Sequence, residues 1–592
     1  MGILNMLSPG IQVNEVDLTT IVPAASTSVG GYVGEFTWGP CNEPTLITDE
    51  IQLVDVFGKP TINVTNSFLA TSFFSCANFL AYTESLYVIR AIDSNTAKNA
   101  QVSANANVSV IIKNEEEFEN TYLNINSANT YGEFVAKYPG SMGNSLKVSV
   151  CANSATFATW EYRKLFDTAP GTSQYIEDAR NNPTANDELH VIVVDEDGVF
   201  TGKSGTILER WPNLSKATDC VDVDGLSSYY KRRLMTSSKY IYAIDPVNYT
   251  NSSATWGTHS QDTTTYFSPA NNYTVSLTGG ANGGVVPDSV LQTSWDSFRN
   301  KDRYEISLAF TGASNIVVSQ YVLDNIILGV ESETPVIGRK DAMLFVSPRI
   351  TDVVNQSGSE VANIVTNVES FVNVFNRYSS YLVVDSGWKY QFDKYNNIYR
   401  WVPLNADIAG LCAYTDDVAD TWYSPGGYNR GKLKNVVKLA WSPDQTQRDA
   451  LYKAGINPVI TQIGEGTLLF GDKTMQKKPS AFDRINVRRL FIVLEKVISR
   501  AAKYSLFEYN DAFTRAQFVA TVEPYLRTVQ GRRGITDFKV VCDESNNTPD
   551  IIDRNGFVGD IYIKPARSIN FIQLNFVAVK TGVEFTTVVG NF

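Results

Sequence analysis

Apolar residues recur at helical spacing in the C-terminal region of the chain. Between residues 361 and 375 they fall at i, i+3, i+4 and i+7, the pattern of a helix with one buried face. The same spacing recurs between residues 487 and 501, and a third amphipathic stretch runs from about Ala512 to Val529 with Pro524 late in it. In the second helix we expect five charged residues to face away from the buried side: Arg488, Arg489, Glu495, Lys496 and Arg500.

Earlier segments predict a mixture of helices and strands. Asn66 and Ser67 are candidate caps for a helix that ends near Leu80, and residues 86–89 predict a buried strand. From about 96 to 345 Asn, Ser, Thr, Gly and Tyr dominate, which predicts short strands and long exposed loops. Because the C-terminal region has helices followed by strands, we expect an α+β fold.

Both ends of the chain have the pattern of a short strand. The first follows a Pro-Gly turn and places Ile11, Val13 and Glu15 on one side, and the last runs from Val583 to Val589. A strand without a local partner presents free backbone donors and acceptors, so it can complete the sheet of a neighbouring molecule. Pairing within its own subunit explains the same pattern, and both readings stay open.

Composition narrows the possible functions. The chain has 592 residues, with 50 Lys and Arg against 62 Asp and Glu, a net charge of −12 that argues against bulk nucleic-acid binding. His190 and His259 are the only histidines, so the chain has almost no histidines from which a metal site or a catalytic triad could be built. No apolar run approaches the length of a membrane span, and no signal-peptide pattern begins the chain, so we expect synthesis in a cytoplasm without membrane insertion.

The six cysteines lack zinc-site spacing. The nearest two, Cys41 and Cys76, are 35 positions apart, so we expect buried thiols in a reducing compartment.

Glycine-rich and acidic motifs fall short of known ligand sites. Residues 198–204 resemble a phosphate-binding loop but have three residues between the glycines instead of four. Residues 195–198 and 219–225 are interpreted as acidic turns rather than calcium loops, and residues 464–466 as a tight turn. His190 and His259 are interpreted as surface or loop histidines. We therefore predict no enzyme activity and no catalytic, cofactor or metal site.

Charge is unevenly distributed along the chain. Residues 471–540 contain 14 basic and 7 acidic residues, although the whole chain is acidic. A basic face can steer docking onto an acidic partner or between copies, and a solvated helix face explains the same charges.

Several segments, in order, resemble the contractile tail sheath proteins of myophages and related injection machines. The resemblance begins with Leu7–Glu15 and continues through Gly30–Pro40, Phe57–Pro60, Tyr138–Asn144 and Ser424–Gly431. Met142 stands where the family pattern has Trp, and Gly426 stands in place of Ala. The most specific matches are C-terminal: Gly464–Gly466, Gly471–Thr474, Ile485–Phe491, Tyr525–Leu526, Asn546–Thr548 and Ile561–Pro565.

The resemblance implies a core α+β domain built from both chain ends, with β-rich outer domains inserted between them. An outer domain is implied in two segments, 23–95 and 190–345, with a nested outermost domain (96–189) between them. The other implied segments are an N-terminal arm (1–22), the core sheath domain (346–580) and a C-terminal arm (581–592). The arms join neighbouring subunits through Ile11, Val13 and Glu15 and through Val583, Phe585 and Thr587.

The implied function is structural. Copies stack as rings in a helical sheath around a tail tube, and the sheath contracts to drive the tube through the host envelope. The other implied partners are baseplate and tail terminator proteins, the location is the virion after assembly in the host cytoplasm, and neither a cofactor nor direct nucleic-acid contact is implied. The candidate residues for tube or inter-subunit contact are Lys477, Lys478, Arg484, Arg488, Arg489, Lys496, Arg500 and Lys503.

One alternative function stays open. The Asn-, Thr- and Tyr-rich loops also suit a baseplate or fibre protein that binds cell-surface glycan, although ordinary β-rich surfaces have the same composition.

Overall fold

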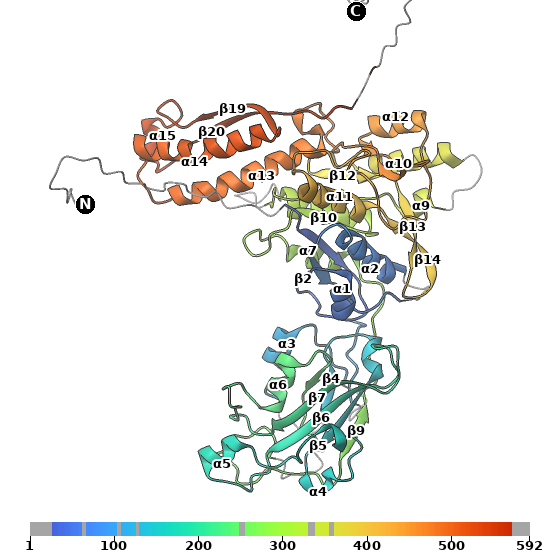
Figure 1. Ribbon diagram of the computed structural model, residues 1–592, viewed down its shortest axis with the longest axis vertical. Helices are drawn as coiled ribbons and strands as arrows, with labels where there is room; N and C mark the ends of the chain where they lie inside the picture. The colour runs from blue at the N-terminus through green and yellow to red at the C-terminus, as the bar shows by residue number, and fades with distance from the viewer. Residues whose placement is uncertain are drawn as a thin grey trace, which may run out of the picture. The chain divides into compact units, whose positions relative to one another are not determined.

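The computed structural model describes residues 27–61, 67–102, 108–125, 130–247, 255–329, 338–354, 360–570 and 573 (Figure 1). These residues fall into two compact units. The main unit lies within Pro23–Thr421 and Pro425–Ser499, and the C-terminal unit comprises Trp422–Ser424 and the described residues from Arg500 onward. Each unit has buried apolar residues of its own. The arm residues Ile11, Val13, Glu15, Val583, Phe585 and Thr587 lie outside the described residues.

A seven-stranded sheet organises the main unit. Its order is β16-β12-β11-β10-β1-β3-β2, and neighbours pair in parallel except β2, which runs antiparallel to β3. Its strands are short apolar runs, as expected for a parallel sheet buried on both faces. They are β1 (Gly30–Gly34), β2 (Thr45–Ile47), β3 (Leu86–Arg90), β10 (Leu308–Phe310), β11 (Met343–Val346), β12 (Leu382–Asp385) and β16 (Ile456–Asn457).

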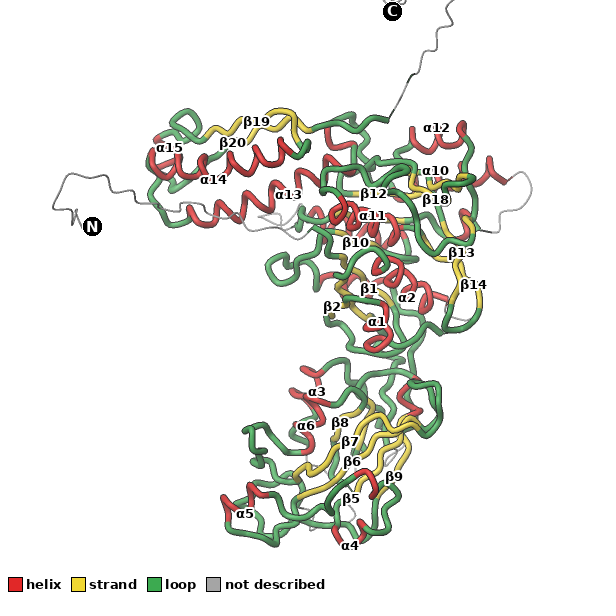
Figure 2. Tube along the Cα trace, in the orientation of Figure 1, coloured by secondary structure: helices red, strands yellow, loops and turns green. Residues whose placement is uncertain are grey.

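Alternate residues of these strands point into two apolar layers. In β11, Leu344 and Val346 belong to one layer, whereas Met343 and Phe345 belong to the other. Helices supply much of the rest of each layer, and Figure 2 shows helices around these strands. The first layer includes α7 (Asp288–Asp296), α8 (Ile316–Tyr321), η3 (Val322–Leu328) and α10 (Glu360–Phe375), and the second includes α1 (Glu50–Phe57), α2 (Ser67–Leu80) and α11 (Asn405–Val418).

The glycines of β1 allow the close approach of helix α2. A Cβ on Gly30 would lie 2.5 Å from the Phe79 ring, and one on Gly34 would lie 2.7 Å from Ser72 Oγ. Both distances are shorter than van der Waals contact, so a side chain at either position would push the helix away from the sheet.

A second body within the main unit is mainly antiparallel. One sheet has the order β7-β6-β5-β9, and β4 pairs with β8. These strands are β4 (Phe134–Ala136), β5 (Leu146–Cys151), β6 (Glu188–Asp195), β7 (Thr206–Ser215), β8 (Ile241–Ala243) and β9 (Tyr273–Ser276). Four short helices accompany them: α3 (Glu115–Thr121), α4 (Ser154–Phe157), α5 (Gln174–Arg180) and α6 (Tyr230–Ser237).

Most of the strands predicted for 96–345 are short, as expected, but the prediction missed the helices α7, α8 and η3 near the end of that range. The strands β10 and β11 belong to the central sheet, where β10 pairs with β1 and β11 pairs with β12. The sheet therefore joins segments that the resemblance assigns to different domains. The domain limits themselves remain predictions.

The main unit also contains small antiparallel sheets and further helices. The three-stranded sheet contains β13 (Trp388–Asp393), β14 (Ile398–Pro403) and β15 (Lys438–Leu439). β17 (Val459–Gln462) and β18 (Gly466–Leu469) form a hairpin whose Gly464 and Gly466 have φ of 84° and 89°, which confirms the predicted tight turn. Two further helices are α9 (Ile350–Val353) and α12 (Gln445–Lys453).

The C-terminal unit combines a long helix with a β-hairpin. α14 (Ala512–Gly531) begins at the cap Asp511, whose side chain accepts a hydrogen bond from Thr514 N at 2.8 Å, and it contains Pro524. β19 (Ile535–Val541) pairs antiparallel with β20 (Asp560–Pro565), and α15 (Pro549–Asp553) lies between them in sequence.

The mixed α+β class is confirmed, and so are the predicted helices. α2, α10 and α14 match the predicted ranges, and α13 (Ile485–Ala502) contains the predicted helix 487–501. The parallel order of the central sheet was not predicted, because its pairings join strands far apart in the sequence.

Buried polar side chains gather where strands of the central sheet end. Asp385 at the end of β12 accepts hydrogen bonds from Ser347 Oγ at 2.6 Å and Gly387 N at 2.9 Å. Lys389 donates to Asp407 at 2.8 Å, and both side chains are fully buried. Burial raises the pKa of Asp385 to about 8, with a further contribution from the charge of Asp407. Asp385 is therefore mostly protonated in the folded chain at neutral pH.

The Asp385→Asn variant tests this protonation. Because the pKa is higher in the folded state than its ordinary value of 3.8, Asp385 contributes stability below about pH 4 that is lost as the pH rises to about 8. We expect the Tm of Asp385→Asn, relative to the unmodified chain, to increase between pH 5 and pH 8. Asp93→Asn is the control, because hydrogen bonds from Thr96 and Asn95 lower the pKa of Asp93 and keep it charged across this range. The Tm of this variant, relative to the unmodified chain, should therefore stay constant between pH 5 and pH 8. Parallel Tm profiles for Asp385→Asn and the unmodified chain would contradict the prediction.

Candidate functional site

The β19–β20 hairpin is the described sheet with the most exposed strands. Apart from the buried Ile535, every residue of the two strands is exposed or half-buried. Within the C-terminal unit, α14 packs against β19, and its buried residues include Phe518, Val522 and Leu526. Among the described residues β19 pairs only with β20, so each strand has one edge without a described partner. Such a two-stranded sheet can accept additional strands.

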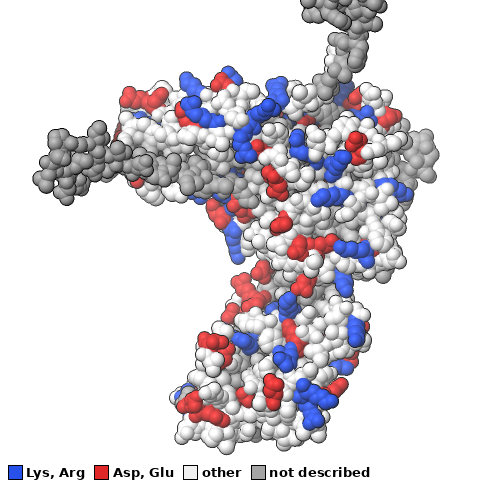
Figure 3. Space-filling view, in the orientation of Figure 1, with Lys and Arg blue, Asp and Glu red and all other residues white. Residues whose placement is uncertain are grey.

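The candidate basic residues do not form one exposed face. Lys477, Lys478 and Lys503 are exposed, and Arg484, Lys496 and Arg500 are half-buried. Arg488 and Arg489 are buried, so the expectation that they face away from the core is wrong. On the face shown in Figure 3, basic and acidic side chains are interspersed.

Arg489 is buried because it finds partners inside the main unit. Its Nη2 lies 2.6 Å from Asp416 Oδ2, and its Nη1 donates to the Cys412 carbonyl at 2.9 Å. Thr27 Oγ1 donates to the same carboxylate oxygen of Asp416 at 2.6 Å. The guanidinium thus connects helix α13, helix α11 and the start of the described chain.

Arg488 and Lys496 are also held by internal contacts. The Arg488 guanidinium lies 4.1 Å from the centroid of the Tyr381 ring and donates to its hydroxyl at 2.7 Å. Lys496 lies 3.3 Å from Glu305 and donates to Ser307 Oγ at 2.8 Å. These residues stabilise the packing of α13 within the main unit.

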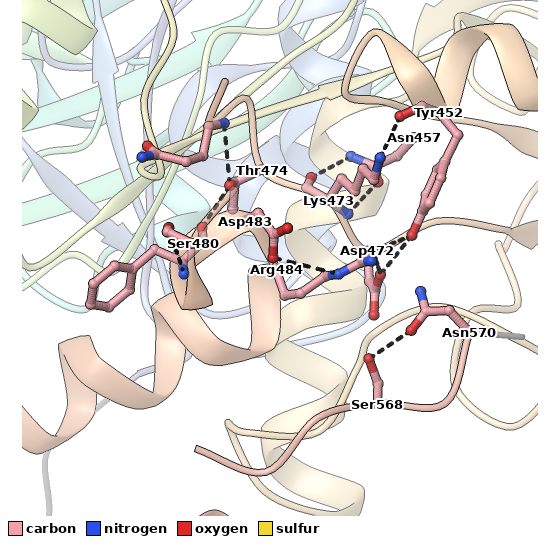
Figure 4. A network of polar contacts seen from close by, with 12 residues as sticks. Tyr452, Asn457, Asp472, Lys473, Thr474, Ser480, Asp483, Arg484, Ser568 and Asn570 are labelled. Atoms are coloured by element: carbon pink, nitrogen blue, oxygen red, sulfur yellow. Dashed lines mark hydrogen bonds and ion pairs between the residues drawn. The ribbon is translucent and has the colours of Figure 1, made fainter. Parts of the chain in front are cut away.

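A polar network fixes the chain just before α13 (Figure 4). Arg484 lies 2.9 Å from Asp472 and hydrogen-bonds the hydroxyl of Tyr452. Lys473 Nζ donates to the Tyr452 carbonyl at 2.7 Å, and Lys473 N donates to Asn457 Oδ1 at 2.7 Å. Burial and the nearby Asp472 raise the pKa of Tyr452 to about 12, so this hydroxyl stays protonated. The network is structural. The candidates Lys477 and Lys478, which lie between Lys473 and Arg484 in the sequence, are exposed.

The structure corrects the interpretation of His190. It lies in β6, is fully buried and stacks on Phe166 with 4.5 Å between ring centroids. Nδ1 accepts a hydrogen bond from Asn213 N, and burial lowers the pKa of the ring. His259 is confirmed as a loop residue, 3.4 Å from Asp219. A histidine in a strand is buried or exposed according to which face is covered, and the residues that cover His190 are distant in sequence.

The other sequence motifs are structural. All six cysteines are free and buried, as predicted. Asp195 accepts hydrogen bonds from Ser145 and Thr201 and closes the turn between β6 and β7, and Asp222 accepts from the backbone of Asp224 and Leu226. The described residues include no cluster of His, Cys, Asp and Glu that could hold a metal ion. None of their helices combines the length and apolarity that crossing a membrane requires.

Comparisons with known proteins identify the family. The model of the phage tail sheath protein central domain matches residues 338–475, and that of the phage tail sheath C-terminal domain matches residues 477–578. The chain is 32% identical to the tail sheath protein of Vibrio phage KVP40, covering 99% of this chain and all of that protein. The tail sheath protein of Enterobacteria phage T4 gives the same identity and coverage. The chain therefore belongs to the phage tail sheath protein family.

A solved structure shows the same fold at low sequence identity. A sheath tail protein from Listeria innocua is 11% identical, with a TM-score of 0.52 that covers 92% of this chain and 93% of that one. The resemblance found in the sequence motifs is confirmed along the whole chain.

Replacing Arg489 tests its structural role. Arg489→Ala leaves Asp416 buried without its cation, so we expect a loss of about 3–5 kcal/mol in the free energy of unfolding, measured in urea. Arg527→Ala is the control, because Arg527 makes an exposed pair with Glu523 and its loss should cost less than about 1 kcal/mol. Equal effects of the two substitutions would contradict the assignment.

Proposed function

We propose that this chain is the structural subunit of a contractile phage tail sheath, which polymerises around an inner tube and contracts to drive the tube through the host envelope. The observation that carries the proposal is 32% identity over 99% of the chain to two phage tail sheath proteins. The role is mechanical, with no catalytic step and no cofactor. The subunit belongs to the virion tail and assembles in the host cytoplasm with tube, baseplate and terminator proteins.

The edges of the β19–β20 hairpin, which have no partner among the described residues, support a linking role for the chain ends. Strands that join such an edge gain backbone hydrogen bonds without needing a shaped pocket. In the proposed sheath, residues 1–22 and 581–592 of neighbouring copies add to this hairpin, with Ile11, Val13 and Glu15 in one arm and Val583, Phe585 and Thr587 in the other. Such links can hold copies together while their other surfaces slide.

Contraction then needs no nucleotide. A sheath assembled in a metastable extended state releases free energy if the contracted lattice buries more apolar surface or pairs more charge. The buried contacts of Arg489 and the two-layered central sheet keep the main unit rigid, so the movement takes place between subunits.

Deletion of either arm tests the linking role. Chains lacking residues 1–16 or 581–592 should fold with an unchanged far-UV circular dichroism spectrum, because the described buried apolar residues of both units come from other segments, and should fail to polymerise. Negative-stain electron microscopy measures polymer length. Tubes of normal length from either truncated chain would contradict the arm mechanism.

Burial reduces the number of candidate residues for contact with the tube. Because Arg488 and Arg489 are occupied inside the main unit, Lys477 and Lys478 are the exposed candidates of that unit. Lys477 lies 4.5 Å from the Tyr378 ring centroid and keeps its charge at the surface.

Charge reversal tests this contact. Lys477→Glu combined with Lys478→Glu should weaken co-sedimentation with tube protein at low salt, with a smaller difference at high salt because exposed charges are screened. Lys203→Glu reverses an exposed charge in the antiparallel body and should leave co-sedimentation unchanged. Full tube binding by the double variant would show that Lys477 and Lys478 do not form the tube contact.

A further inference from the structure

An apolar segment projects from the connection between α13 and α14. Five large apolar side chains within residues 504–513 are exposed to solvent. Their exposed fractions are 73% for Tyr504, 63% for Leu506, 105% for Phe507, 86% for Tyr509 and 75% for Phe513. All belong to the C-terminal unit. Single exposed apolar residues are ordinary on protein surfaces, but five within ten positions are not.

The polar residues of the segment hold it to its own unit. Asn510 Nδ2 donates to the Gly556 carbonyl at 2.7 Å, and Asp511 caps α14 through Thr514 N. The usual arrangement is therefore inverted, since polar side chains bind the fold and apolar side chains point outward. These contacts present the apolar side chains on an anchored loop.

Phe507 has a backbone conformation that large residues rarely adopt. Its φ is 70°, in the left-handed region, and its side chain is fully exposed. A bulky residue in this region costs free energy that no described contact of its ring offsets. Burial of the ring against a partner would offset this cost.

We propose that residues 504–513 form a docking surface for a second copy of this chain, separate from the terminal arms. The five side chains present on the order of 700 Å² of apolar surface, close to the roughly 800 Å² per partner of a standard interface. The net charge of −12 makes copies repel one another, so a contact between them benefits from non-ionic attraction.

The partner choice rests on the proposed function. A tube that moves through a contracting sheath must be released from it, and a large apolar contact would oppose that release. In the proposed sheath, copies of the subunit stay associated before and after contraction. A durable apolar contact therefore fits a second copy better than it fits the tube.

Polymerisation of the full-length chain tests the inference. Phe507→Ser combined with Tyr509→Ser should raise the critical concentration for polymer formation about tenfold or more, measured by sedimentation. High salt should not remove the contact in the unmodified chain, because apolar attraction is not screened. Ile463→Ser is the matched control, since Ile463 is equally exposed at the β17–β18 turn.

Four results would overturn the inference. One is an unchanged critical concentration in the double variant while the unmodified chain polymerises, which leaves the proposed function standing. Another is a double variant that polymerises normally alone but fails to assemble on tube protein, which would assign the segment to tube binding. A lowered Tm with unchanged polymerisation would assign it to contacts within the chain. An unmodified chain that forms no polymer, with or without tube protein, would overturn the proposed function as well.

Discussion

The central parallel sheet must be covered on both faces, and the rest of the main unit follows from this constraint. Each strand sends alternate side chains into two apolar layers, so helices have to pack on both sides. The strands come from widely separated segments, and the antiparallel body is inserted between β3 and β10. Glycines in β1 let α2 approach closely enough to seal one layer. An insertion can therefore vary in its loops without disturbing the sheet.

Buried charge completes this arrangement. Arg489 bonds Asp416 and the Cys412 carbonyl, and Lys389 bonds Asp407 in the interior. Such pairs contribute little net stability, but each charge is costly without its partner, so they favour one packing arrangement over others. The proposed contacts with other molecules lie at Lys477 and Lys478 of the main unit, and at the β19–β20 edges and the 504–513 segment of the C-terminal unit.

The sequence predicted local structure well where one periodicity dominated. The helices α2, α10, α13 and α14 follow from apolar spacing, and the turn at Gly464 follows from its glycines. The same spacing led to the wrong prediction that Arg488 and Arg489 face solvent. A helical pattern identifies the apolar face of a helix but not which residues cover the sides next to that face. Tyr381 and Asp416, which draw these two arginines inward, are more than 70 positions away. The exposed 504–513 segment was also missed, since apolar residues in a connection resemble a buried segment until their surroundings are known.

The amino-acid sequence by itself determined the family, the mixed α+β class and the absence of familiar catalytic motifs, because these depend on residue identity and local order. Only the tertiary structure decided which strands pair, which arginines are buried, that His190 lies in a core, and which apolar residues remain outside. Each of these depends on residues brought together from distant regions of the chain. Burial is a property of the surrounding atoms, so identical side chains such as Arg489 and Arg527 acquire different roles from their neighbours alone.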